Sequence, residues 1–118
     1  GLTACEKWDT PFAFQWGYPN GWAPLHAIAV EGLLRYGFDE DALRIAKKYV
    51  ALVESNYETT GYLWEKYNVV DGSVLVSQER LASEMPPMMG WSAGVYLYMK
   101  AVIETSRSLR ICHRQEEV

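Results

Sequence analysis

Three short strings of this 118-residue chain contain Trp or Tyr, and the second and third also contain a glutamate. The strings are QWGYPNGWAP (Gln15–Pro24), EKYNV (Glu65–Val69) and EMPPMMGWSAGV (Glu84–Val95). A carboxyl group can give or take the proton that the hydrolysis of a stable bond requires. Trp and Tyr, of which the chain has five and eight, have flat faces that pack on the C–H faces of sugar rings, although they equally fill cores and interfaces. A carbohydrate site is therefore one hypothesis for the aromatic residues, and ordinary packing is the other.

The charge balance argues against several other functions. The chain has 11 Lys and Arg residues and 15 Asp and Glu residues, for a formal net charge of −4. A nucleic-acid partner would require a clustered basic surface, and a membrane span would require about 18 consecutive apolar residues. Neither pattern is present, and we find no Ser–His–acid, nucleotide-binding or metal-ligand motif. We therefore expect no nucleic-acid partner, no membrane segment, no metal and no cofactor.

Two cysteines, Cys5 and Cys112, lie at opposite ends of the sequence. They could form a disulfide only if the two ends meet, and neither has a second ligand at metal-like spacing. Two free or buried thiols are the simpler interpretation, and the redox compartment stays open.

Apolar periodicity predicts three helices, which run from Gly21 to Tyr36, from Glu40 to about Tyr57, and from about Trp91 to Ser108. Asn20 and Asp39 are candidate N-caps for the first two. The second helix has one apolar stripe and one charged side, which is typical of a helix on an outer surface.

The third predicted helix is apolar nearly all the way round. Such a helix must be covered on every side, and three helices cannot surround one of their own members. We therefore expect this chain to be a piece of a larger helical assembly, completed by more of the same polypeptide or by another subunit. The irregular stretch 68–87 before this helix is long enough to indicate a functional loop.

The first string resembles a signature of the trehalases, the glycoside hydrolase family 37 enzymes. That signature reads Gln-Trp-Asp, a variable residue, Pro, a variable residue, a small residue, Trp, a small residue, Pro. Gly17 stands where the family has Asp. The matching residues are Gln15, Trp16, Pro19, Gly21, Trp22, Ala23 and Pro24.

The second string resembles the Glu-Lys-Tyr-Asp segment of the same family, with Asn68 in place of Asp. In the family that glutamate is the catalytic base, so the resemblance assigns this role to Glu65. A solvated Glu–Lys pair at the edge of an element is the plainer alternative. The family's catalytic acid is an aspartate well upstream, near an arginine-containing signature, and no carboxylate of this chain matches it.

The third string resembles a Glu-Tyr-Pro segment followed by Gly-Trp-Thr-Asn-Gly-Val, although the glycine-rich run that precedes it in the family is absent. The residues that match are Glu84, Pro86, Gly90, Trp91, Gly94 and Val95. The family's loop glutamate contacts the sugar, so the resemblance makes Glu84 a substrate ligand, with Glu79 as the rival.

The resemblance also completes the predicted sugar pocket. Trp16, Trp22 and Trp91 are candidate walls, and Asn20 is a further candidate ligand. The structural alternative for the tryptophans is packing, and the structural alternative for Asn20 is capping of the helix.

The resemblance covers roughly residues 10 to 104 and implies an all-α fold. Residues 1–118 would form the C-terminal part of an (α/α)6 barrel, with three to four helices and a long active-site loop. The implied function is inverting hydrolysis of α,α-trehalose, with this chain supplying the base and the remainder of the barrel supplying the acid. The alternatives are a barrel glycosidase for another α-glucoside and a non-catalytic or truncated trehalase-like protein.

Overall fold

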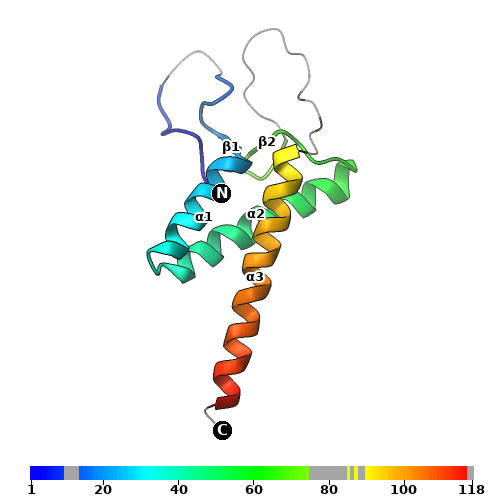
Figure 1. The fold of residues 1–118 in the computed structure, drawn as a ribbon. Coiled ribbons are helices and arrows are strands. Elements are labelled where there is room, and N and C mark those ends of the chain that lie inside the picture. Colours follow the sequence, from blue (N-terminus) through cyan, green and yellow to red (C-terminus); the bar gives the residue numbers. More distant parts are fainter. Residues whose placement is uncertain (10–13, 75–84, 86, 88–89, 117–118) are drawn as a thin grey trace.

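The computed structural model describes residues 1–9, 14–74, 85, 87 and 90–116, and of residues 109–116 it describes the backbone alone. This part of the chain is mostly helical, which confirms the predicted all-α class (Figure 1). Its elements follow in the order β1 (Asn20–Trp22), α1 (Ala23–Arg35), α2 (Asp39–Thr60), β2 (Lys66–Asn68) and α3 (Gly90–Glu116).

The three helices pack against one another around one apolar core. The apolar stripe of α2 supplies most of this core, as its amphipathic sequence predicts. Val30 of α1 and Met99 of α3 are fully buried against it. The buried residues of the stripe are Ala42, Leu43, Ile45, Ala46, Tyr49, Val50 and Val53.

The first predicted helix begins two residues later than expected. Residues 20–22 are extended and pair with β2, so α1 starts at Ala23, with Pro24 in its first turn. The interpretation of Asn20 as an N-cap is therefore wrong. Trp22 occupies that position, and no side-chain cap is made.

The second helix begins one residue before the predicted start and ends three residues later than expected. Asp39 is its first residue rather than its cap, and Phe38 precedes it. Asp39, Glu40 and Asp41 all lie in the first turn, where negative charge stabilises the positive end of the helix dipole. The helix ends at Thr60 and is capped by Gly61, whose φ of 75° is the left-handed conformation that glycine adopts most easily.

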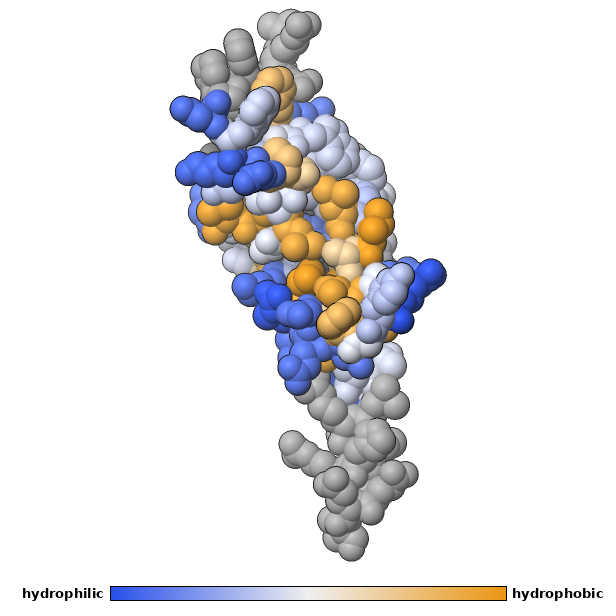
Figure 2. All heavy atoms as spheres, turned by 90° about the vertical axis from the view of Figure 1, so that its left-hand side faces the viewer, coloured by the Kyte–Doolittle hydropathy of each residue, from blue (hydrophilic) through white to orange (hydrophobic). Residues whose placement is uncertain are grey.

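The third helix extends from the β1–β2 corner past α2 to a free end (Figure 1). Met99 and Ile103 face the core, whereas Leu97 is 65% exposed. Ile28 on α1 is 69% exposed as well. Figure 2 shows apolar side chains gathered in the middle of one face of the molecule, between polar margins. Apolar surface thus stays uncovered within the described residues, as the all-round apolar pattern predicts. None of the helices in the described part is long and apolar enough to cross a membrane.

A buried histidine fastens the N-terminal segment to α1. His26 is fully buried, and its Nε2 accepts a hydrogen bond from the backbone N–H of Leu2 at 2.9 Å. Its Nδ1 lies 2.8 Å from the carbonyl oxygen of Trp22, so the neutral ring carries its proton there and donates it. Burial lowers the pKa of His26 from its ordinary value, against the opposing effect of the Trp22 carbonyl. Both ring nitrogens are therefore used in contacts that hold the backbone in place.

Candidate active site

The antiparallel β1–β2 pair brings the first two strings together. Asn20 lies opposite Asn68, Gly21 opposite Tyr67, and Trp22 opposite Lys66. Gly21 is required in this ladder, because a Cβ there would meet the Val69 side chain and lie 2.7 Å from the carbonyl oxygen of Leu2. Two segments that are more than 40 residues apart in the sequence therefore share one corner of the molecule (Figure 1).

Three tryptophans form a continuous cluster at this corner. The rings of Trp16 and Trp22 are stacked, with centroids 3.9 Å apart and planes inclined by 7°. Trp91, in the first turn of α3, makes a T-shaped contact with Trp22, with ring centroids 5.6 Å apart and planes at 88°. Trp22 is 1% exposed, whereas Trp16 and Trp91 are 48% and 37% exposed. Trp22 is thus the buried support of a partly open aromatic surface.

Glu65 lies directly before β2, at the edge of this cluster. Its side chain is 15% exposed, so it is neither in bulk solvent nor sealed off. Oε2 accepts a hydrogen bond from Nζ of Lys66 at 3.1 Å and a longer one from Nε2 of Gln15 at 3.5 Å. Gln15 precedes Trp16, so the carboxylate is connected directly to the first string.

The carboxylate-bearing segment is also tied to α3. The hydroxyl of Ser92, which is fully buried, donates to the carbonyl oxygen of Trp64 at 2.6 Å. A single β-bridge joins Trp64 to Pro87. These contacts hold the start of α3, and with it Trp91, beside Glu65.

A hollow of about 550 Å³ opens next to the exposed side of Trp16. Trp8 and Phe14 line it together with Trp16, and the first two rings are stacked at 6.2 Å. The carboxylate of Glu6 is also in its wall. An aromatic hollow with few polar groups is the usual form of a small-molecule site.

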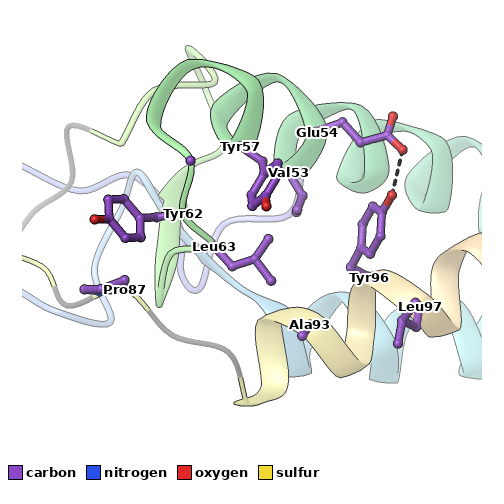
Figure 3. Close-up of a pocket in the computed structure, with 10 residues that line it drawn as sticks. Val53, Glu54, Tyr57, Tyr62, Leu63, Pro87, Ala93, Tyr96 and Leu97 are labelled. Atoms are coloured by element: carbon purple, nitrogen blue, oxygen red, sulfur yellow. Dashed lines mark hydrogen bonds between the residues drawn. The ribbon is translucent and has the colours of Figure 1, made fainter.

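A second hollow, of about 640 Å³, lies between α2 and α3 and is also lined by residues 61–63 and Pro87 (Figure 3). Its walls are mainly apolar and aromatic, and they include Tyr57, Tyr96 and Leu97. Its carboxylate is Glu54, which accepts a hydrogen bond from Tyr96 at 2.8 Å and pairs with Lys100 at 3.4 Å. None of the predicted site residues that the structure describes lines this groove.

The structure brings together Glu65, Trp16, Trp22 and Trp91, whereas it places Asn20 beneath them. Asn20 is fully buried, and its amide donates to the carbonyl oxygen of Gln15 at 2.8 Å, which fixes the loop that carries Trp16. Direct sugar contacts by Trp22 and Asn20 stay predictions, and they would require their neighbours to move. Glu84 and its rival Glu79 lie outside the described residues.

Sequence reasoning missed Lys66, Gln15 and Ser92 as members of this corner. Gln15 and Lys66 lie inside the matched motifs, and this was the one indication in the sequence that they belong to the site. The partners of their side chains depend on the β1–β2 pairing, which the sequence did not predict. Among the described residues, no group of three or more His, Cys, Asp or Glu side chains could hold a metal ion.

Comparison with known proteins identifies the family. The trehalase family model matches residues 3–103. The chain belongs to the trehalase family. It is 47% identical over 55 residues to a periplasmic trehalase of Pseudomonas aeruginosa, across 47% of this chain and 10% of the relative. It is 42% identical over 88 residues to a probable trehalase of Oryza sativa subsp. japonica, across 70% of this chain and 15% of the relative.

A putative periplasmic trehalase of Salmonella typhi is 37% identical over 89 residues, which cover 75% of this chain and 15% of the relative. The chain therefore spans about a tenth to a seventh of the length of these curated trehalases.

Two departures from the trehalase motifs have a physical explanation. Oδ1 of Asn68 accepts hydrogen bonds from the backbone N–H groups of Val70 and Asp71, at 3.0 and 3.2 Å. This turn requires one acceptor oxygen, which an amide supplies as well as the family's carboxylate does. Gly17 is tightly placed, because a Cβ there would lie 3.1 Å from the carbonyl oxygen of Phe14. The local backbone thus suits glycine at the position where trehalases have Asp.

Proposed function

We propose that residues 1–118 are the C-terminal segment of an (α/α)6 trehalase catalytic domain, and that Glu65 is the general base for inverting hydrolysis of α,α-trehalose to glucose. The position of Glu65 carries this proposal. Its carboxylate is 15% exposed, held by Lys66 and Gln15, and borders an aromatic surface with partly open rings. Membership of the trehalase family supports the substrate and the role.

Inversion requires two carboxyl groups about 6.5–9.5 Å apart, so that a water molecule fits between the base and the anomeric carbon. Ionised Glu65 takes a proton from this water as the water oxygen bonds to the anomeric carbon. The bond from that carbon to the bridging oxygen breaks with its electron pair, and a carboxylic acid protonates the departing oxygen. This acid comes from the remainder of the barrel.

The sugar packs on the exposed face of Trp16, with Trp91 as a second wall. Trp22 and Asn20 act from behind, because Trp22 supports the Trp16 ring and Asn20 fixes its loop. Glu84, by its resemblance to the family's loop glutamate, is a further sugar ligand.

Uncovered apolar surface supports the proposal that this segment belongs to a larger barrel. Ile28 of α1 and Leu97 of α3 are both about two-thirds exposed, and exposed apolar area of this kind marks an interaction surface. Neighbouring helices of the ring would bury these side chains, and the isolated segment is expected to associate and to lack activity.

The test measures glucose release from trehalose by the full-length protein and by two matched variants. Glu65→Gln removes the proposed base while keeping the shape of the side chain, and turnover is expected to fall by about 10²–10⁴-fold. Glu54→Gln changes a second glutamate that pairs with a lysine, and turnover is expected to stay within about twofold, because an exposed ion pair contributes little. Full activity in the Glu65→Gln protein would refute the assignment of the base.

The stereochemistry and the substrate are tested separately. Proton NMR during the first minutes should show one β-glucose and one α-glucose for each trehalose cleaved, whereas retention would give α-glucose alone. Glucose release from another α-glucoside, without release from trehalose, would reassign the substrate. No hydrolysis of any α-glucoside would favour the non-catalytic alternative.

A further inference from the structure

Lys66 is a fully buried cation at the centre of the candidate site. Its side chain is 0% exposed, although it lies in a three-residue strand near the surface. Removing an ammonium group from water costs several kcal/mol, roughly, unless the protein replaces the lost solvation. A lysine is therefore retained in such a place only where its charge has partners.

Two of its partners belong to the site. Nζ lies 3.1 Å from Oε2 of Glu65 and 5.0 Å from the centre of the Trp22 ring. An indole face attracts a cation within about 6 Å, and more strongly when both are desolvated. The Trp22 ring is itself fixed by Trp16 and Trp91. The ammonium is thus held in one place between a rigid aromatic ring and the carboxylate.

These contacts make the two oxygens of Glu65 different. Oε2 accepts from both Lys66 and Gln15. Within the part of the chain that the structure describes, Oε1 accepts no side-chain hydrogen bond. The terminal torsion of a glutamate is broad and nearly two-fold, so the oxygens would exchange easily if neither were held. With Oε2 fixed by these two donors, Oε1 is the oxygen left to accept a proton from an incoming water.

The geometry points to Lys66 as a positioning residue that acts through Glu65, with Gln15 as the second donor. It holds Oε2 so that Oε1 takes the proton from the attacking water. This inference rests on the proposed role of Glu65 as the base. In this role Lys66 does not contact the sugar, and its charge, rather than its bulk alone, is what the site uses.

The test uses kinetics of the full-length protein on trehalose with Lys66→Met, which keeps the length of the side chain and removes its charge. Misplacing a reacting group by about 1 Å can cost about 100-fold in rate, so we expect kcat to fall by about 30- to 100-fold and KM to change by less than about threefold. Lys66→Arg restores a cation, so its kcat should be higher than that of Lys66→Met by at least about a third of the decrease in log kcat. Lys100→Met, at the exposed ion pair, is the matched control and should leave kcat unchanged.

A double-mutant cycle separates positioning from a structural role. If Lys66 acts through the carboxylate, Lys66→Met should not lower kcat further in the Glu65→Gln background. A loss of structure would lower it equally in both backgrounds. Additive effects, or an unchanged kcat in the single Lys66→Met variant, would overturn the inference.

Two outcomes keep the inference distinct from the proposed function. Full activity of the Glu65→Gln protein would refute the assignment of the base and the inference that depends on it. An inactive Glu65→Gln protein together with normal activity of the Lys66→Met protein would support the base and refute the positioning role of Lys66. If Lys66→Met does not fold, Gln15→Leu serves in the same cycle, because the Gln15 side chain is not fully buried. It should lower kcat by about three- to tenfold, and an unchanged kcat there would count against the inference.

Discussion

Two glutamate–lysine pairs of the same chemistry lie in very different surroundings. Lys66 and Glu65 pair at 3.1 Å with side chains 0% and 15% exposed. Lys100 and Glu54 pair at 3.4 Å with side chains 42% and 44% exposed. Each pair stands near aromatic residues: Nζ of Lys66 lies 5.0 Å from the centre of the Trp22 ring, and Glu54 lines a hollow together with Tyr57 and Tyr96.

The difference teaches that burial, and not residue type, makes a carboxylate suited to chemistry. Water screens the Glu54–Lys100 pair, so the pair contributes little and its members can rotate apart. Around Lys66 little water remains, so the same Coulomb attraction is several times stronger and the geometry is fixed. The Glu54–Lys100 pair links α2 and α3, whereas the Glu65–Lys66 pair holds the carboxylate that we propose as the base. Mutations in each region can sharpen or break this comparison.

The largest effect on stability is expected at Trp22. Trp22→Ala in the full-length protein removes a ring that is 1% exposed and contacts Trp16, Trp91 and Lys66. Loss of a buried aromatic side chain costs about 3–5 kcal/mol, which a shift of the urea unfolding midpoint measures.

Tyr57→Ala is the counterpart in the groove between α2 and α3, where the ring is 53% exposed. We expect it to cost less than about 1 kcal/mol, as surface substitutions do. Equal costs at the two positions would break the comparison, because the groove would then be as closely packed as the tryptophan cluster.

The sequence predicted the helices well and the β1–β2 corner poorly. The stripe from Ala42 to Val53 on α2 repeats over several turns, so its period is unmistakable. Strands of three residues are too short to show a period of two, and their pairing joins residues more than 40 positions apart. Asn20 is of a residue type that often caps a helix, but here its side-chain amide donates to the carbonyl oxygen of Gln15 instead.

The candidate site was predictable only in part for a related reason. Glu65 and the tryptophans carry the family resemblance, so their numbers could be assigned before any fold was known. Lys66 could not be placed, because lysine is normally exposed and its burial depends on Trp22, which lies opposite it in the ladder. The partner of Ser92 is a backbone carbonyl 28 residues away, and no local pattern indicates it.

A smaller effect is expected at Ser92, whose buried hydroxyl joins α3 to Trp64. Ser92→Ala leaves the Trp64 carbonyl oxygen without this donor, and an unsatisfied buried group costs about 1–3 kcal/mol. Ser92→Thr, which keeps a hydroxyl, should retain most of the stability.

Ser108→Ala is the matched control, because that hydroxyl also bonds a backbone carbonyl but is exposed. Its expected cost in urea unfolding of the full-length protein is below about 0.5 kcal/mol. If Ser92→Ala were as mild as Ser108→Ala, the link between α3 and the carboxylate-bearing segment would be unimportant for stability.

The smallest effect is a pH dependence at His26, on the buried side of the comparison. Burial lowers its pKa in the folded protein below the unfolded value of about 6.5. Between these two pKa values the unfolded chain binds more protons, so stability rises with pH through this window. The contribution is complete above about pH 6.5 and is lost as pH falls toward the folded pKa.

The slope is at most about 1.4 kcal/mol per pH unit, and urea unfolding between pH 7.5 and 5.5 measures it. His26→Gln keeps an acceptor for the Leu2 N–H and a donor for the Trp22 carbonyl oxygen, but it cannot be protonated. This variant should therefore lose less stability than the parent below pH 6.5. Parallel curves for the parent and His26→Gln would mean that His26 is as readily protonated in the folded protein as in the unfolded chain. Burial would then not control the pKa of His26, contrary to what the comparison of the two ion pairs indicates for buried groups.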